Sequence, residues 1–150
     1  MGRMVSFNVT STAKGIQTQL QAKEHQYYLD EPSHVGGQNS GPTPLHALLG
    51  ALAGCESITA FAAAKSMNLH VEEVSIHVIG ELNPDGMKGN KEVKTYYEKV
   101  EIHVQLSSSE SIEDIHALKH KVEERCPVYN LFKAAGVKMI SKWELKGNTT

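Results

Sequence analysis

Polar and apolar residues alternate in the first third of the chain, which predicts short strands with one buried face. Residues 5–9, VSFNV, show this alternation and are typical of a half-buried strand. Gly15 marks a turn, and two more strands are predicted at residues 16–22 and 25–29. Residues 30–42 are rich in Pro, Gly, Ser and Asn, so we expect a loop there.

A long helix is predicted after this loop. Thr43 can cap it, and Pro44 suits the first turn because its missing N–H has no helical partner there. Apolar and small residues continue to about Ser66. Gly50 and Gly54 each cost ~1 kcal/mol against alanine in a helix, which favours close packing by another backbone. We therefore expect a central helix that is covered on most sides.

Two long strands follow, each with one apolar and one polar face. Val74, Ile76 and Val78 alternate with polar residues, and residues 99–106 repeat the pattern. The connection between them contains NPDGMKGNK, residues 83–91, which is typical of a loop or a wide hairpin.

Two helices and a strand complete the predicted fold. Ser111 opens the first helix, with Asp114 placed as in a capping box, and this helix ends where Pro127 follows Cys126. Residues 128–135 read as a short helix, and the apolar residues among 137–145 as a last strand. This order of elements predicts an α+β fold with mainly antiparallel pairing. We expect one domain over residues 1–150.

Composition excludes several classes of protein. The net charge of −2 and the lack of a basic run give no sign of nucleic-acid binding. The first residues lack the apolar core of a secretory signal, so we expect a cytoplasmic protein. Residues 45–64 have the length of a membrane span. His46, Cys55 and Glu56 interrupt that segment, and we expect a buried helix and no membrane partner.

The chain has two cysteines, Cys55 and Cys126, which lie 71 positions apart. Two such residues in a reduced compartment are by default buried thiols of the core. Cys126, however, precedes a Pro-initiated helix whose first amides point toward it and favour a thiolate. A metal site is the weaker alternative, because His116 and His120 would need ligands from elsewhere. We expect no metal and no cofactor.

Two motifs surround these cysteines. The stretch GPTPLHALLGALAGC, residues 41–55, resembles the first cysteine motif of the OsmC/Ohr family (osmotically inducible protein, organic hydroperoxide resistance). ERCPV, residues 124–128, resembles the second motif, and the resemblance covers essentially the whole chain. It implies an OsmC-like fold, with a mainly antiparallel sheet, a central buried helix and an intertwined homodimer.

The resemblance also implies a reaction. Family enzymes reduce organic hydroperoxides and hydrogen peroxide, so Cys55 would attack the peroxide and become a sulfenic acid. Cys126 would then resolve it to a disulfide, and a dithiol reductant, such as a lipoyl protein, would restore both thiols. The expected partners are a second copy of the chain, a small-molecule peroxide and that dithiol.

The chain departs from the family's peroxidases at two positions. Those members carry a Glu where this chain has Leu45, and they use an Arg from the N-terminal strands. The two arginines here are Arg3, at the chain end, and Arg125, beside the second cysteine. Lys14 is the nearest basic residue to the expected place and is the candidate activating cation. These departures indicate a divergent branch, and they leave open a binding or carrier module with weak or no peroxidase activity.

Three further residues are candidates near Cys55. Glu56 follows it and is a candidate site residue; the alternative is a partly exposed helix residue paired with a lysine. His46 reads as a surface residue of the first helical turn, with a catalytic role as the alternative. His34, in the polar loop, could approach the site across a dimer.

Overall fold

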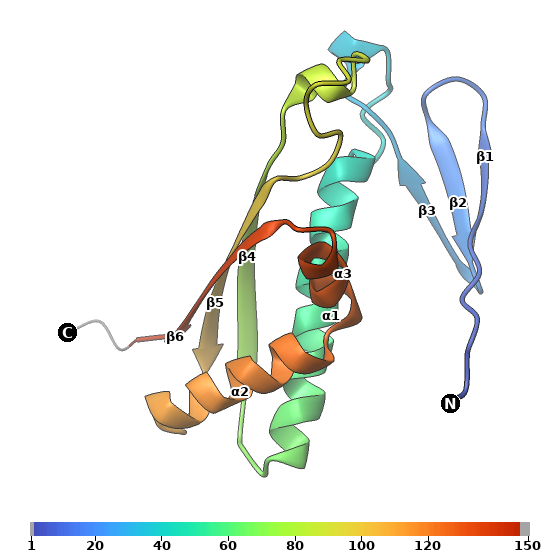
Figure 1. Ribbon diagram of the computed structural model, residues 1–150. Helices are drawn as coiled ribbons and strands as arrows, with labels where there is room; N and C mark the ends of the chain where they lie inside the picture. The colour runs from blue at the N-terminus through green and yellow to red at the C-terminus, as the bar shows by residue number, and fades with distance from the viewer. Residues whose placement is uncertain (1, 148–150) are drawn as a thin grey trace. The chain divides into compact units, whose positions relative to one another are not determined.

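The computed structural model describes residues 2–147, and these form two compact units that meet between Leu48 and Leu49 in the chain (Figure 1). The single domain predicted over residues 1–150 includes Met1 and residues 148–150, which the structure does not describe. The single domain therefore stays a prediction.

The first unit contains an antiparallel sheet in the order β1-β2-β3. Two of its strands confirm the sequence prediction at 16–22 and 25–29, whereas the strand predicted at residues 5–9 is wrong. Thr10 pairs with Gln21, near the end of the second strand, so earlier residues have no opposing strand. Phe7 is accordingly 92 % exposed. The three strands are β1 (Thr10–Ala13), β2 (Thr18–Ala22) and β3 (His25–Leu29).

The loop predicted over residues 30–42 is organised around a buried carboxylate, which the sequence pattern did not reveal. Asp30 is 1 % exposed and accepts hydrogen bonds from the backbone N–H groups of Glu31, Gln38 and Ser40. The Ser40 hydroxyl donates to it at 2.7 Å. That hydroxyl, together with the backbone amides, holds the pKa of Asp30 below its usual value against the effect of burial. A short 3-10 helix, η1 (Ser33–Val35), lies within this loop.

The long helix α1 (Pro44–Ser66) begins and ends where the sequence predicts. Thr43 Oγ1 accepts a hydrogen bond from the backbone N–H of His46 at 3.2 Å, which confirms the cap. The His46 ring nitrogen Nδ1 lies 2.6 Å from the same hydroxyl. His46 is therefore an exposed residue of the helix start, as its surface interpretation predicts.

The second unit contains a three-stranded sheet in the order β4-β5-β6. β4 and β5 pair antiparallel, and β5 and β6 pair parallel because two helices carry the chain back to the starting edge. Three of the four strand pairings in the two sheets are thus antiparallel, as predicted. The elements are β4 (Glu73–Glu81), η2 (Pro84–Gly86), β5 (Lys99–Ser107), α2 (Ile112–Arg125), α3 (Pro127–Ala134) and β6 (Lys138–Leu145).

The core of the second unit lies between one face of this sheet and the helices (Figure 1). The inward side chains of β5, from Val100 to Leu106, are almost fully buried, whereas Lys99, Glu101 and His103 lie on the opposite, half-exposed face. This confirms the predicted alternation of apolar and polar positions. The helices add Leu52, Ala60, Ala63, Ile115, Leu118, Val122 and Phe132 to the same cluster.

One face of α1 differs from the prediction. The helix is buried only along the face of Leu52, Glu56 and Ala60, whereas Ile58 is 75 % exposed. A Cβ atom added at Gly50 or Gly54 would meet nothing within 4 Å. The expected cover on most sides is therefore not made by the described residues of the second unit, 49–147. By its length and composition alone, α1 is long and apolar enough to cross a membrane. The core helix of a soluble protein meets the same two criteria.

Candidate functional site

The two cysteines come together in the second unit. Cys55 lies in the middle of α1 and is half-buried, whereas Cys126 joins α2 to α3 and is fully buried. Both are free thiols, and a hydrogen bond connects their side chains. Two cysteines that lie 71 positions apart in the sequence are thus in direct contact in the structure.

Cys126 is fixed by the helix ends on either side of it. Its backbone N–H donates to the carbonyl of Val122 at 2.8 Å, which closes α2. Its Sγ accepts a hydrogen bond from the backbone N–H of Tyr129 at 3.4 Å, as an N-cap of α3 does. The Asn130 side chain donates to its carbonyl oxygen at 2.9 Å. The predicted approach of helix amides to this thiol is confirmed.

The net effect on ionisation is the opposite of the one expected from the amides alone. Burial raises the pKa of the Cys126 thiol well above its usual range, while the Tyr129 N–H lowers it by less. The hydrogen bond with Cys55 and the charges of Cys55 and Glu56 raise it further. The expectation of a thiolate at Cys126 is therefore wrong, because desolvation outweighs one weak hydrogen bond to sulfur.

Glu56 is a buried carboxyl group within this site. It is fully buried, and neither of its carboxyl oxygens has a hydrogen-bond partner among residues 2–147. Burial, and then the charge of Glu123, raise the pKa of Glu56 to about 7. The alternative of a partly exposed residue paired with a lysine is wrong, since Glu56 shares the helix face of Leu52 and Ala60. Such an unsatisfied group costs ~1–3 kcal/mol.

Two residues of the site were missed by the sequence analysis. Tyr129 is buried, and burial, then Glu123 and Glu56, raise the pKa of its hydroxyl. Glu123 acts electrostatically on both Glu56 and Tyr129 from α2. Each lies three positions from Cys126, one before and one after, and that helical spacing was the signal available.

The remaining sequence candidates lie elsewhere. Lys14 is an exposed residue between β1 and β2, in the first unit, and its role toward Cys55 stays a prediction. His34 is exposed in η1 of the same unit. Arg125 neighbours Cys126 in the chain, but its guanidinium is exposed and donates to the Ser66 hydroxyl at 3.3 Å. Cys55, Cys126 and Glu56 are thus the predicted residues that the structure brings together.

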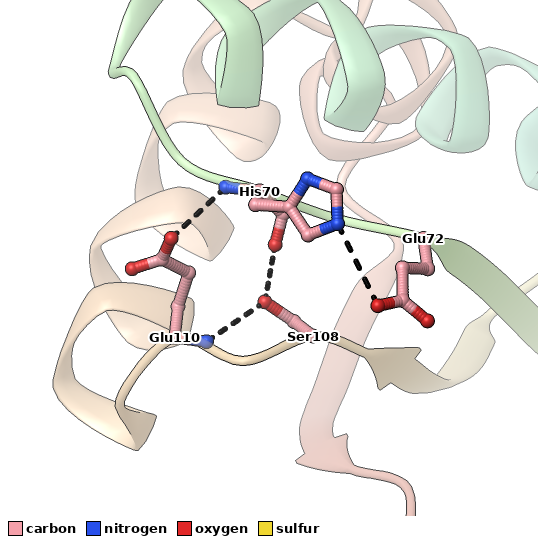
Figure 2. Close-up of polar contacts among 4 residues, drawn as sticks. All are labelled: His70, Glu72, Ser108 and Glu110. Atoms are coloured by element: carbon pink, nitrogen blue, oxygen red, sulfur yellow. Dashed lines mark hydrogen bonds and ion pairs between the residues drawn. The ribbon is translucent and has the colours of Figure 1, made fainter.

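A second polar cluster contains serine, histidine and glutamate, and Figure 2 shows that its connections are those of a structural brace. The Ser108 hydroxyl donates to the backbone carbonyl of His70, not to its ring. The His70 ring lies 3.5 Å from Glu72, and its backbone N–H donates to Glu110 at 3.0 Å. The Ser108 hydroxyl is thus bonded to backbone groups, and the cluster joins the segment before β4 to the segment before α2.

The described residues 2–147 contain no preformed metal site. Within residues 2–147, His, Cys, Asp and Glu side chains form no group of three or more that could hold an ion. His116 and His120 are exposed on α2.

Comparisons with known proteins give one consistent result. A family model described as OsmC-like protein matches residues 37–142. The solved structure of an OsmC-like protein from Mycoplasma pneumoniae has a TM-score of 0.80 at 22 % identity, covering 94 % of this chain and 97 % of that one. No curated protein matches the sequence significantly.

Two more distant structures carry a functional description. An organic hydroperoxide resistance protein OsmC from Legionella pneumophila has a TM-score of 0.69 at 16 % identity, over 96 % of this chain and 98 % of that one. An organic hydroperoxide resistance protein from Elizabethkingia anophelis has a TM-score of 0.71 at 16 % identity, over 99 % and 100 %. At these identities the similarity establishes the α+β fold of the chain.

Proposed function

The chain belongs to the OsmC-like family, whose model matches more than half of it, and from this premise we propose that it is a thiol-dependent peroxidase of the cytoplasm. Its substrates would be organic hydroperoxides and hydrogen peroxide. The observation that carries the proposal is the contact between a half-buried thiol, Cys55, and a fully buried one, Cys126. A peroxidatic thiol must be reachable from solvent, whereas a resolving thiol need only reach its partner.

The proposed cycle has three balanced steps. The Cys55 thiolate attacks the terminal peroxide oxygen, the O–O bond breaks, and the alcohol leaves after taking a proton, so that Cys55 becomes a sulfenic acid. Cys126 sulfur then attacks Cys55 sulfur, the S–O bond breaks, and water leaves as the disulfide forms. A dithiol, such as a lipoyl group, finally reduces the disulfide by exchange and is itself oxidised to a disulfide.

The same proposal includes a homodimer. The open face of α1 carries Gly50, Gly54 and the 75 % exposed Ile58, and exposed apolar surface of this kind marks interaction sites between proteins. Small residues on that face allow close approach of another backbone. A second copy of this chain is the proposed cover, and it would supply the packing that the sequence predicts.

A binding or carrier module is the second candidate function. Leu45 occupies the position where the family's peroxidases carry a Glu, and it favours this reading. A module of this kind would keep the fold and the two thiols without reacting with peroxide.

The deciding experiment is a thiol count after one equivalent of cumene hydroperoxide. The wild type should lose both thiols and form an intramolecular disulfide. Cys126→Ser should stop at a sulfenic acid on Cys55 that dimedone traps, and Cys55→Ser should keep its Cys126 thiol. If both thiols of the wild type stay free under excess peroxide, the binding module replaces the peroxidase.

A further inference from the structure

Glu56 is a buried carboxyl group that the proposed cycle has not yet used. It is fully buried, both of its oxygens lack hydrogen-bond partners within residues 2–147, and it directly follows Cys55 in α1. Its charge acts on the Cys126 thiol, which is itself fully buried and hydrogen-bonded to Cys55. A buried carboxyl group with no structural partner therefore acts electrostatically on the one thiol of the pair that must lose a proton inside the core.

We propose that Glu56 is the proton acceptor for Cys126 when the Cys55–Cys126 disulfide forms. The inference rests on the proposed function for its place in the peroxide cycle, although the proton transfer itself needs only an electrophilic sulfur at Cys55. The proposed role adds Glu56 to the step in which Cys126 resolves the oxidised Cys55. Packing of the core alone would not require a carboxyl group at this position.

The transfer balances as follows. The Cys126 S–H bond breaks and its proton passes through one water molecule to the Glu56 carboxylate, while Cys126 sulfur attacks the sulfur of the Cys55 sulfenic acid. The S–S bond forms and the S–O bond breaks. Glu56 then gives its proton to the departing hydroxide, so that water leaves and the carboxylate is regenerated. Cys126 is oxidised, and the peroxide has already supplied the oxidising equivalent.

The surroundings of Glu56 suit a group that exchanges protons near neutral pH. The negative charge of Glu123 in α2 acts on Glu56, and the charge of Glu56 acts in turn on Cys126 and on the Tyr129 hydroxyl. Burial and Glu123 raise the pKa of Glu56 to about 7, so both of its protonation states are populated there. A carboxyl group with an ordinary pKa would be a poor acceptor for a thiol.

The test separates this step from peroxide chemistry. 5,5′-Dithiobis(2-nitrobenzoate) converts Cys55 to a mixed disulfide and releases one thionitrobenzoate; attack by Cys126 then releases a second. In the wild type, the rate of the second release should rise with pH and level off above about pH 7, as Glu56 ionises. In Glu56→Gln it should be about tenfold slower or more at neutral pH, and should keep rising with pH without levelling.

Glu123→Gln is the matched variant, because it removes the neighbouring charge and keeps Glu56. It should move the midpoint of the pH profile to lower pH, and this shift can be measured even if Glu56→Gln fails to fold. Equal profiles for wild type and Glu56→Gln, an unmoved midpoint in Glu123→Gln, or no second release would each overturn the inference. Normal profiles in a protein inert to cumene hydroperoxide would refute the peroxidase and leave the role of Glu56 standing.

Discussion

Cys55 and Glu56 are consecutive in α1, yet Cys55 is half-buried and Glu56 is fully buried. One helical step of about 100° separates their side chains. The site thus lies where the buried face of α1 meets its open face. Cys55 is therefore partly open to solvent, whereas the carboxyl group of the next residue is shielded from it.

The two thiols should differ in their reaction with an alkylating reagent. Iodoacetamide at neutral pH should modify Cys55 before Cys126 by a factor of about ten or more, because Cys126 is buried and its pKa is raised. Peptide mapping by mass spectrometry at successive times measures both rates. In 6 M guanidinium chloride, as a control, the rates should converge; equal rates in the native protein would refute the asymmetry.

Glu56 should make the protein less stable as the pH rises. Its pKa is raised from 4.5 to about 7, so between these values the folded state keeps a proton that the unfolded chain loses. The free energy of unfolding should therefore fall through this window, by up to ~3 kcal/mol, and level off above it. Urea denaturation from about pH 4 to pH 8 measures the change.

The matched variant for this measurement is Glu56→Gln, which removes the titrating group and keeps its size. Its stability relative to the wild type should increase with pH over the same window. Glu92→Gln, at an exposed loop position, should track the wild type throughout. A difference between Glu56→Gln and wild type that does not change with pH would show that Glu56 titrates normally.

The sequence identified the elements around the site well, because their signals are local. The cap at Thr43, the cap at Ser111 and the break at Pro127 each act over one helical turn, and the structure places α1, α2 and α3 accordingly. The alternation in β4 and β5 likewise depends on neighbouring positions. The error at residues 5–9 has a non-local cause, since alternation supplies no partner strand.

The sequence predicted the two cysteines of the site but not the ionisation of its buried groups. The cysteine motifs gave Cys55 and Cys126, but burial decides how a carboxyl or thiol group ionises, and burial is set by contacts between distant elements. Glu56 was therefore a weak candidate until its helix face was known. Glu123 joins the site from α2 and Tyr129 from α3, and the sequence marks them only by their three-residue spacing from Cys126.

Gly80 should tolerate no side chain. A Cβ atom there would lie 2.5 Å from Cε1 of the Tyr97 ring, and that ring packs against Phe132 at a centroid distance of 6.2 Å. Gly80→Ala should lower the free energy of unfolding by ~1–3 kcal/mol, because the core must shift to make room. Ser75→Ala, on the exposed face of the same strand, is the control and should change stability by less than about 0.5 kcal/mol.

The proposed dimer predicts a specific response at Ile58. Ile58→Glu would place a charge on the open face of α1, so it should convert a stable dimer into a monomer or an unfolded chain. Sedimentation should show a wild-type mass that does not halve on dilution. Ile79→Glu, a partly exposed apolar position of β4, is the control and should stay dimeric. A folded wild-type monomer at sub-micromolar concentration would rule the dimer out.

Lys14 offers a test of the activating cation. If Lys14 stabilises the thiolate of Cys55, Lys14→Ala should slow alkylation of Cys55 by iodoacetamide at neutral pH without changing the unfolding transition, because Lys14 is exposed. Lys91→Ala, also exposed, should alkylate at the wild-type rate. Unchanged kinetics in Lys14→Ala would show that another group activates the thiol.

The crossover between β5 and β6 determines when the thiol pair can exist during synthesis. Cys126 lies in that crossover, and the parallel pairing of β5 with β6 needs residues as late as Leu145. A nascent chain emerging from the ribosome therefore exposes Cys55 long before the segment that holds its partner can dock. Under the proposed cycle, Cys55 would have no resolving thiol during this interval, and an oxidised nascent chain would proceed toward sulfinic acid. In that cycle, the formation of β6 would also be the moment at which the oxidation of Cys55 becomes reversible.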